Sequence, residues 1–417
     1  MRHVIVGTGI AGTLAAETIR KLDPESSITL LGREPFYPYC RPMTTMFLEG
    51  KIAPEEMVIR EASDFRSRDI QLLVGEPVRE IDIAERKVET EQGKVIPFDR
   101  LLIAAGADPI DLEVDGAGLG NIFCMRKWKD AETISGALPD VRSALIVGGG
   151  LVGLKAAQAL IHRGIRVAMA EKLAYPLPLV VDPKSGAVIS GRLEDLGIAL
   201  KMGTTVSAFV GNGRVKEAVF DDGSKVSCDL VVIAIGARPA VPFLEKGTMT
   251  VDQGIHVDSY LETDVEGVYA AGDVAEAMDV VVHRKKVNAI WPVAVEQGIT
   301  AGMNMAGRRV PYRGSMGRNV LRIGDLDVLT GGLVNPPPGE DYEVLEDEDP
   351  RRKTYRKLVF QGDILKGLAM LNRVEKGGIL LSMIQNQIPV SMEKERLFDP
   401  GFDFSQLLPN SHLCKGG

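Results

Sequence analysis

Two glycine-rich segments have the residue types and spacing that bind the pyrophosphate of a dinucleotide. They read HVIVGTGIAG, beginning at His3, and ALIVGGGLVG, beginning at Ala144. In each, an apolar run leads into a G-x-G-x-x-G turn, whose glycines allow a tight turn, close backbone approach to the phosphates and close helix–strand packing. The phosphates then lie at the helix N-terminus, where unpaired N–H groups and the helix dipole favour negative charge. Two turns predict two dinucleotide sites.

The candidate binding residues are the glycines of the two turns and the residues that begin the following helices. A single turn of this kind also occurs for packing alone, but two with the same spacing favour nucleotide binding. The candidates are Gly7, Gly9, Ile10, Ala11 and Gly12 in the first turn, and Gly148, Gly150, Leu151, Val152 and Gly153 in the second.

Each turn is followed by the same downstream pattern, DRLLIAAGADP at 99–109 and DLVVIAIGARP at 229–239. This repetition indicates a duplicated nucleotide-binding unit and adds Ala105, Gly106 and Gly236 as candidates. A third motif, ETDVEGVYAAGDVAEA, contains a predicted strand over 268–271 that ends in Gly272 and Asp273. The Asp273 carboxylate is placed to hydrogen-bond a sugar-like hydroxyl.

The order of these motifs from Met1 to about Gly307 resembles the FAD-dependent pyridine nucleotide oxidoreductases, which include ferredoxin, rubredoxin and nitrite reductases and NADH oxidases. The resemblance implies an α/β fold with two Rossmann-like dinucleotide-binding domains, the NAD domain inserted in the FAD domain, and a C-terminal α+β interface domain. The expected limits are 1–110 and 244–317 for the FAD-binding domain, 111–243 for the NAD(H)-binding domain and 318–417 for the interface domain. The first turn then binds FAD and the second NAD(H).

The secondary structure expected around the turns is a strand, a helix and a strand, typical of a βαβ unit. The ranges are 2–6, 11–21 and 27–31 in the first unit, and 144–147, 151–163 and 166–171 in the second. After Gly307, a proline-rich link at 335–338, an acidic run and the alternating segments KTYRKLVFQGD and ILKGLAMLN predict an antiparallel sheet. Seven of the ten residues at 340–349 are acidic, and we interpret this run as a solvated hairpin tip or a partner-docking segment.

The residue that ends the second strand of each unit should select the nucleotide. Glu171, 18 residues after Gly153, can accept both ribose hydroxyls of NADH and repel the extra phosphate of NADPH. Lys172 beside it leaves room for NADPH, and a solvated strand end is the alternative. In the first unit the expected acid is replaced by Gly32, so Glu34 is the predicted ribose ligand of FAD.

Cys40, in PFYPYCRPMTTM, is the candidate for covalent redox chemistry. Disulfide reductases carry C-x-x-x-x-C and a His-Pro base, and this sequence has neither. NADH oxidases and coenzyme A disulfide reductases, however, use a single cysteine, which would leave a redox role for Cys40. The segment instead resembles Y-D-R-P-x-x-S-K of the ferredoxin-reductase branch, which leaves a packed or flavin-adjacent thiol as the alternative for Cys40. The resemblance places Arg41 and Pro42 at the R-P, and the guanidinium of Arg41 suits the FAD pyrophosphate.

The same resemblance exposes a rearrangement of charge. In that branch a lysine after the R-P and a glutamate past the second turn pair beside the flavin. Here the two positions hold Met46 and Lys155. Lys155 is therefore a candidate for tuning the flavin potential, unless it extends along its helix to solvent. The segment KVNAIWPVAVEQGITAGMNMAG resembles the family's helix beside the flavin and adds Trp291 and Gln297 as FAD contacts, although helix packing explains its small residues equally well.

Composition narrows the class of protein. The chain has 417 residues, of which 45% are hydrophobic and 25% charged, and its net charge of −8 argues against nucleic acid or an anionic membrane as the main partner. We expect a cytoplasmic protein, because no apolar run is long enough to cross a membrane and no signal peptide precedes the first strand. The four cysteines, at 40, 124, 228 and 414, are far apart and do not cluster with histidine, so we expect no metal site.

The sequence therefore predicts an FAD-dependent NADH:acceptor oxidoreductase. It would transfer hydride between NADH and FAD, and single electrons to or from an iron-sulfur protein or subunit. The alternatives are an NADH oxidase or coenzyme A disulfide-type reductase that uses Cys40, and a flavin-holding or assembly subunit without turnover, which the missing Lys–Glu pair would suit. The overall sequence, including the tail LFDPGFDFSQLLPNSHLCKGG, is similar to flavin subunits of anaerobic phenylglyoxylate- or aldehyde-oxidising complexes. We expect a hetero-oligomer or a homodimer.

Overall fold

The computed structural model describes residues 1–403 and 405. The chain forms two compact units, each described by itself. The first comprises Met1–Leu173, Gly197–Asp279 and His283–Ser315, and the second comprises Ala174–Leu196, Val280–Val282 and the chain from Met316 on. Both nucleotide-binding sheets lie in the first unit, so the predicted limits between the FAD and NAD(H) domains stay a prediction.

The first sheet of this unit has five parallel strands in the order β19-β7-β1-β2-β3. Their bounds are β1 (Arg2–Val6), β2 (Ser27–Gly32), β3 (Gln71–Val74), β7 (Arg100–Ile103) and β19 (Val268–Ala270). Because β19 follows the whole second repeat in the chain and still pairs with β7, the second nucleotide-binding domain is inserted in the first, as predicted. Strands β1, β7 and β19 are apolar and largely buried, as expected inside a parallel sheet.

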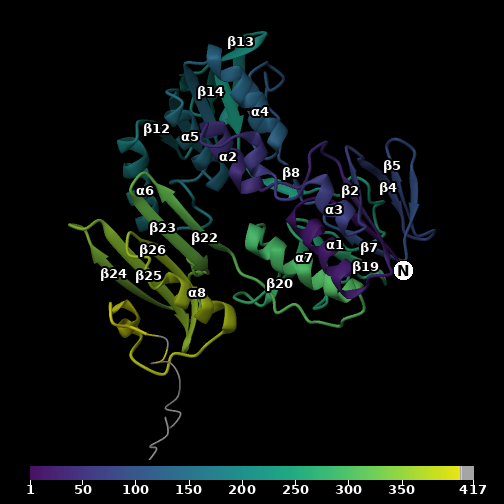
Figure 1. Ribbon diagram of the computed structural model, residues 1–417. Coiled ribbons are helices and arrows are strands. Elements are labelled where there is room, and N and C mark those ends of the chain that lie inside the picture. The colour runs from purple at the N-terminus through teal and green to yellow at the C-terminus, as the bar shows by residue number, and fades with distance from the viewer. Residues whose placement is uncertain (404, 406–417) are drawn as a thin grey trace, which may run out of the picture. The chain divides into compact units, whose positions relative to one another are not determined.

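Helices α1 (Ile10–Leu22) and α7 (Trp291–Met305) lie side by side against this sheet (Figure 1). Glycines let their backbones approach closely: a Cβ atom at Gly298 would lie 2.4 Å from the carbonyl oxygen of Ala11, and one at Gly302 would lie 2.8 Å from that of Ala15. This contact fixes the start of α1 beside α7.

The second sheet repeats the design, with parallel strands in the order β12-β11-β10-β16-β9 and helix α5 (Leu151–His162) packed on it. The strands are β9 (Ile122–Cys124), β10 (Ser143–Val147), β11 (Arg166–Glu171), β12 (Ile198–Met202) and β16 (Leu230–Ile233). The predicted bounds of β1 and β11 are confirmed to the residue, and the other predicted elements of the two repeats to within one residue at either end.

Short sheets, antiparallel except for one parallel pair, complete the first unit. Two have three strands each, formed by β4 (Val78–Asp82), β5 (Lys87–Thr90) and β6 (Val95–Pro97), and by β13 (Val206–Asn212), β14 (Arg214–Phe220) and β15 (Lys225–Ser227). A third contains β18 (Ile255–His256), β20 (Ala275–Asp279) and β21 (Arg284–Lys286), and β8 (Ala107–Pro109) pairs with β17 (Ala237–Pro239). The short helices are α2 (Thr44–Glu49), α3 (Ala62–Ser67) and α4 (Trp128–Ala137).

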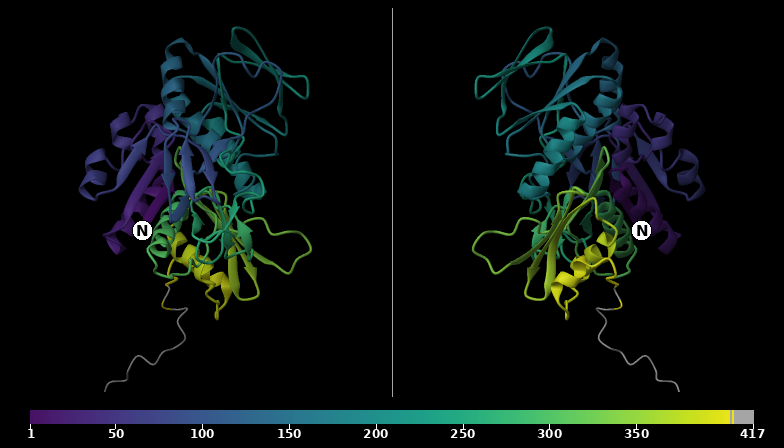
Figure 2. Two further views of the ribbon diagram at one scale, coloured as in Figure 1. Left: turned by 90° about the vertical axis from the view of Figure 1, so that its right-hand side faces the viewer. Right: turned by 90° about the vertical axis from the view of Figure 1, so that its left-hand side faces the viewer.

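The second unit is built on an antiparallel sheet with helices, as expected of the predicted C-terminal α+β domain. Its order is β22-β23-β26-β25-β24, and α8 (Gly377–Asn386) packs on β23 and β26 (Figure 2). The strands are β22 (Arg318–Ile323), β23 (Leu326–Gly332), β24 (Glu343–Asp349), β25 (Thr354–Gln361) and β26 (Ile364–Leu371). Helix α6 (Pro183–Asp195) belongs to this unit too, and its N-cap Asp182 accepts a hydrogen bond of 2.6 Å from the Tyr355 hydroxyl.

The acidic run is a strand and not a hairpin tip. Most of it forms β24, at the edge of the sheet, paired with β25. Each of the five carboxylates of β24 has a cationic partner within the second unit. The pairs are Glu343–Lys394, Glu346–Lys184, Asp347–Arg356, Glu348–Lys184 and Asp349–Arg352. The run is therefore an edge strand and not the predicted hairpin tip. Its carboxylates remain partly exposed to solvent, as predicted, and four basic side chains pair with them.

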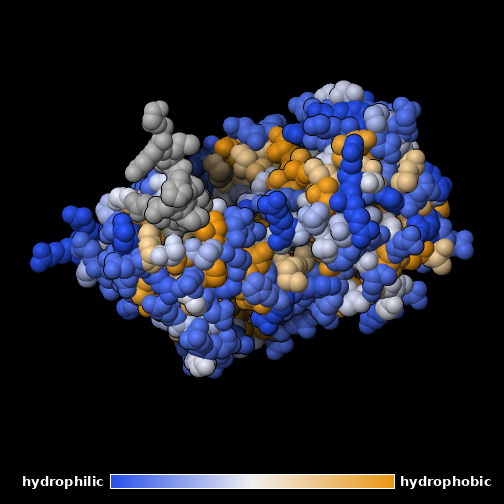
Figure 3. Space-filling model, turned by 90° about the horizontal axis from the view of Figure 1, so that it is seen from below, coloured by the Kyte–Doolittle hydropathy of each residue, from blue (hydrophilic) through white to orange (hydrophobic). Residues whose placement is uncertain are grey.

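Among the residues that the structure describes, no helix is long and apolar enough to cross a membrane. The face shown in Figure 3 is mostly hydrophilic, with apolar side chains in separate patches.

Candidate dinucleotide sites

The first glycine turn leaves room for an anion at the start of α1. Gly7 has φ +117°, and a Cβ atom there would lie 2.1 Å from the carbonyl oxygen of Ala104. A Cβ atom at Gly12 would lie 1.9 Å from the Gly7 carbonyl oxygen, whereas one at Gly9 meets no described atom within 4 Å. Gly9 is the N-cap of α1, and the first turn of this helix carries no acidic residue. Its free N–H groups can therefore bind phosphate.

The second turn repeats these contacts. Gly148 has φ +109°, and its Cβ atom would lie 2.4 Å from the Ala234 carbonyl oxygen. A Cβ atom at Gly153 would lie 2.0 Å from the Gly148 carbonyl oxygen, and one at the N-cap Gly150 meets no described atom within 4 Å. The next two residues, Leu151 and Val152, begin α5 as predicted. Both turns thus have the tight and the open glycines that a pyrophosphate site needs.

The two downstream patterns meet in space. Gly106 and Gly236 both have positive φ, of +71° and +120°, and they end the A-x-G segments whose first carbonyls contact the two turns. The strands that follow, β8 and β17, pair antiparallel. Ala105 and Gly106 therefore lie at the first turn and Gly236 at the second, joined through one small sheet.

The third motif lies against the start of α1. The N–H of Gly272 donates a hydrogen bond of 2.7 Å to Oε1 of the buried Gln297 on α7. A Cβ atom at Gly272 would lie 3.2 Å from Cβ of Ala11 and 3.7 Å from Cβ of Ala294. The geometry thus brings Gly272 and Gln297 to the first turn. Trp291 is the first residue of α7 and is half-buried.

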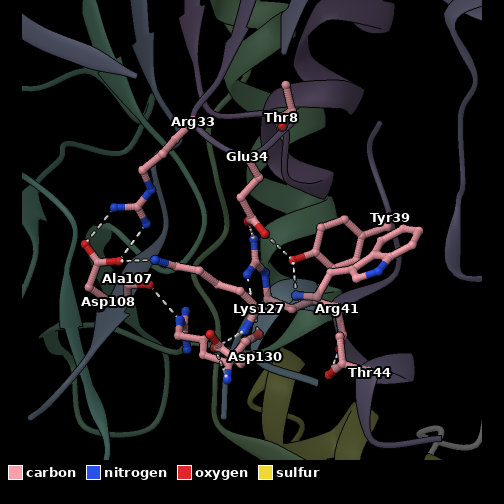
Figure 4. A network of polar contacts seen from close by, with 12 residues as sticks. Thr8, Arg33, Glu34, Tyr39, Arg41, Thr44, Ala107, Asp108, Lys127 and Asp130 are labelled. Atoms are coloured by element: carbon pink, nitrogen blue, oxygen red, sulfur yellow. Dashed lines mark hydrogen bonds and ion pairs between the residues drawn. The ribbon is translucent and has the colours of Figure 1, made fainter. Parts of the chain in front are cut away.

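A polar network joins the predicted ribose and pyrophosphate ligands of FAD (Figure 4). The Glu34 carboxylate accepts hydrogen bonds from the Tyr39 hydroxyl, at 2.9 Å, and from Nη2 of Arg41, at 3.0 Å. Burial disfavours the charge of Arg41, but Tyr39 and Glu34 outweigh it and raise the pKa of the guanidinium. Pro42 follows, exposed, in the 3₁₀ turn Arg41–Met43. Glu34 and Arg41 are thus held together beside the first sheet.

Glu171 lies against the second turn, where the sequence predicted the ribose ligand. Its Oε2 accepts a hydrogen bond of 2.7 Å from the N–H of Gly149, and its Oε1 accepts one of 2.9 Å from the N–H of Leu173. These bonds hold the carboxylate at the end of β11, next to the open Gly150. A nucleotide on the turn would have its adenosine ribose within reach of this acid.

A family model described as pyridine nucleotide-disulphide oxidoreductase matches residues 1–298. The chain belongs to this family. It is an oxidoreductase with sites for FAD and NAD(H), which confirms the predicted class and cofactors. Which of the predicted residues contact each cofactor stays a prediction.

Curated relatives span several electron-transfer systems. The chain is 29% identical over 390 residues to the NAD(P)H nitrite reductase of Bacillus subtilis, covering 93% of this chain but 48% of that protein. It therefore spans about half of that relative. Subunit epsilon of the NADH-dependent phenylglyoxylate dehydrogenase of Aromatoleum evansii is 26% identical, with 95% of this chain and 94% of that protein covered. A chain of the covalent putidaredoxin reductase–putidaredoxin complex has a TM-score of 0.88 at 25% identity, with 97% of both chains covered.

Cys40 departs from the disulfide chemistry in the family's description. The sequence offers no partner in a C-x-x-x-x-C motif, and the described cysteines Cys40, Cys124 and Cys228 are all free thiols. Burial raises the pKa of Cys40, which disfavours the reactive thiolate. Its position next to Arg41 keeps it near the predicted flavin site, and its redox role stays untested.

Lys155 lies on α5, which packs on α2, so the two helices that carry the exchanged residues Lys155 and Met46 are neighbours. Burial lowers the pKa of Lys155, while the nearby Glu49 favours its charge and Lys51 opposes it. Glu49 also pairs with Lys51 at 2.6 Å. Met46, the other exchanged residue, is exposed on α2.

Sequence reasoning missed Arg126. Its Nη2 donates a hydrogen bond of 2.7 Å to Oδ2 of Asp273, and its Nε donates one of 2.6 Å to the carbonyl oxygen of Ala107. It therefore ties the third motif to the first A-x-G segment. The segment CMRKW has no spacing that marks this contact, because both partners are distant in the sequence.

Proposed function

We propose that this chain is an FAD-dependent NADH:acceptor oxidoreductase that passes single electrons to or from an iron-sulfur protein or subunit. The observation that carries the proposal is the pairing of β8 with β17, which joins the two glycine-turn sites within one compact unit. A hydride donor and a flavin both need such sites. The residues present fit FAD, since Gly9 leaves an open approach and Arg41 supplies a cation for the pyrophosphate.

The chain's own residues bind and orient the two nucleotides. The N-termini of α1 and α5 hold the pyrophosphates, Glu34 holds the FAD ribose, and Asp273 holds a hydroxyl of FAD with Arg126 fixing its carboxylate. When bound, FAD accepts hydride from the nicotinamide and releases electrons one at a time. Glu171 selects NADH, because its carboxylate suits two ribose hydroxyls and repels a phosphate.

The names of the relatives support an iron-sulfur acceptor. They include rubredoxin-NAD(+) reductase of Pseudomonas putida, 30% identical over 279 residues, and the assimilatory nitrate reductase electron transfer subunit of Bacillus subtilis. With no paired active cysteine in the sequence, electrons have no second redox group in this chain to which they can pass. The match to nearly the whole phenylglyoxylate dehydrogenase subunit supports a place within a hetero-oligomer. We propose that this assembly is cytoplasmic.

Oxygen is the acceptor in a second candidate function. An NADH oxidase of Methanocaldococcus jannaschii is 29% identical over 343 residues. An oxidase or disulfide reductase that worked through Cys40 would form a sulfenic or mixed-disulfide species there, against the raised pKa of this thiol. Replacement of Cys40 by serine would abolish that activity and leave electron transfer to an iron-sulfur protein intact.

The test compares acceptors with one reduced enzyme. The full chain, loaded with FAD and reduced by NADH without oxygen, is mixed with rubredoxin, with a [2Fe-2S] ferredoxin or with oxygenated buffer, and reoxidation of the flavin is followed. The proposal expects an iron-sulfur protein to reoxidise the flavin faster than oxygen does, equally in the Cys40→Ser variant. Fast reoxidation by oxygen alone, lost in Cys40→Ser, would establish the second candidate instead.

A further inference from the structure

We propose that Asp252, His256 and Glu276 form a binding site for one divalent transition-metal ion, with Zn²⁺ as the reference ion. The three side chains lie in the first unit, and one ligand atom from each lies within 4.8 Å of the other two. The sequence predicted no metal site, because its cysteines do not cluster with histidine and Glu276 lies 20 residues beyond His256.

Strand register brings His256 and Glu276 together. They are directly opposed partners in the parallel pair β18–β20, so their side chains leave the sheet on the same face. Gly254 makes the close approach possible, because a Cβ atom there would lie 2.8 Å from the Val274 carbonyl oxygen and 3.0 Å from the Glu276 nitrogen. The Gly254 N–H donates a hydrogen bond of 3.0 Å to Oε2 of Glu276 and fixes this buried carboxylate.

A chain reversal supplies the third ligand. The N–H of His256 donates to the carbonyl oxygen of Thr250, and that of Asp252 donates to the carbonyl oxygen of Gly254, both at 3.0 Å. This turn folds Asp252 back over the strand. Nε2 of His256 then lies 2.9 Å from Oδ2 of Asp252 and 3.6 Å from Oε2 of Glu276.

The ring nitrogen of His256 lies close to two carboxylate oxygens, where a metal ligand would be needed. Nε2 is fully buried and, among the described residues, has no hydrogen-bond partner, even though a carboxylate oxygen lies 2.9 Å away. Zinc binds nitrogen and carboxylate oxygen at about 2.0–2.2 Å, which puts neighbouring donor atoms about 3–3.5 Å apart in a tetrahedral site. The two distances from Nε2 bracket this range.

Charge and ligand type define the ion. A neutral imidazole with two carboxylates balances a dication, which would relieve the repulsion between the buried Glu276 and Asp252. One nitrogen and two oxygens suit Zn²⁺ and other first-row transition metals, whereas Mg²⁺ and Ca²⁺ favour oxygen-only sites. Asp252 is largely exposed, so water can complete the coordination sphere. The ion would crosslink the 250–256 turn to β20. This strand begins two residues after Asp273, the predicted FAD ligand.

The decisive experiment is a Zn²⁺ titration by calorimetry of the untagged, FAD-loaded full chain after dialysis against chelator. The wild type should bind one equivalent that is lost, or weakened at least tenfold, in His256→Gln and in Glu276→Gln. The matched control is His162→Gln, because Nδ1 of His162 lies 3.0 Å from Oε1 of Glu49 in a histidine–carboxylate pair outside any three-ligand group of the described chain. The control should keep the equivalent, and Mg²⁺ should give no binding heat.

Asp252→Asn separates metal loss from misfolding, since this exposed residue contributes little to the core. The circular dichroism and flavin content of Asp252→Asn should match those of the wild type. Zn²⁺ should raise the midpoint of thermal unfolding of the wild type and of His162→Gln, but not that of Asp252→Asn. A wild type that binds no Zn²⁺ would overturn the proposal. So would an equivalent that survives all three site substitutions, which would place the ion elsewhere, for example on a thiol.

Discussion

A Cβ atom at Gly32 would lie 2.7 Å from both Oγ1 and Cγ2 of Thr8. Thr8 is the second residue of the first glycine turn, and Gly32 ends β2. In the second nucleotide-binding repeat the equivalent residues are Gly149 and Glu171, and here the Glu171 side chain lies over Gly149, which has none. The side chain between turn and strand thus comes from the turn in the first repeat and from the strand in the second. This agrees with the prediction that Glu34, and not the residue that ends β2, is the ribose acid of the first repeat.

Placing a glutamate at Gly32 should therefore impair the first site. Gly32→Glu forces the new side chain into Thr8, and overpacking of this kind costs about 1–3 kcal/mol. We expect FAD affinity to fall about 10-fold or more, and the double variant Thr8→Gly/Gly32→Glu to recover most of it. Fluorescence titration of the apoprotein with FAD measures both. A single variant that binds FAD as well as the double variant would refute the reciprocal relationship.

Nucleotide preference should depend on Glu171. Glu171→Gln keeps the side-chain shape but removes the charge that repels the NADPH phosphate, so the ratio of kcat/KM for NADH over NADPH should fall about 10-fold. Lys172→Ala is the neighbouring control and should leave the ratio the same or raise it. Equal kcat/KM for both nucleotides in the unmodified chain would contradict the role of Glu171.

The flavin potential should respond to Lys155. At an effective dielectric of about 20 and a distance of about 5 Å, one charge contributes roughly 3 kcal/mol to a charged flavin state. Because a cation favours the electron-rich flavin, Lys155→Glu should lower the potential and Lys155→Met should give a value between the two. Redox titration of the three proteins decides. Potentials that agree within error would mean that Lys155 serves the packing of α5 on α2 and not the flavin.

Stability should fall in mild acid because of His3. Burial lowers the pKa of this imidazole to about 4 in the folded chain. In the unfolded chain the pKa is about 6.5, so between these pH values the unfolded chain binds a proton and the folded chain does not. The stabilising effect of the neutral ring is complete above about pH 6.5 and is lost as the pH falls toward 4, by about 2 kcal/mol at pH 5.

The measurement for His3 is urea unfolding at pH 7 and pH 5. The His3→Leu variant should lose less stability between the two pH values than the wild type does, and the exposed His162→Gln should lose as much as the wild type. An identical pH dependence in His3→Leu would show that other groups account for the acid sensitivity.

Local patterns predicted the repeats well because each βαβ unit is encoded in adjacent residues. The apolar run and glycine spacing determined β1 and β11 to the residue, and they placed Glu171 at the turn. The same reasoning failed where partners are distant. The pairing of Arg126 with Asp273 depends on a chain return that no spacing marks.

The structure of two charged segments depends on contacts with residues distant in the sequence and could not be predicted locally. The sequence of the acidic run does not distinguish a hairpin tip from a strand. Its pairing with β25 shows that it is an edge strand, whose carboxylates pair with basic side chains. Nothing in the sequence around Asp252 and His256 marks a metal site, because the third ligand, Glu276, reaches His256 only through the register of β18 and β20. Such contacts depend on sheet order, which the sequence does not encode locally.

The most direct test of the central claim is anaerobic stopped-flow mixing of the FAD-loaded chain with NADH. If the two glycine turns hold a hydride donor and its acceptor, the absorbance of oxidised flavin should bleach within the first turnover, and faster with NADH than with NADPH. A protein that retains FAD but shows no bleaching with either nucleotide would contradict the account and identify the chain as a flavin-holding subunit without turnover.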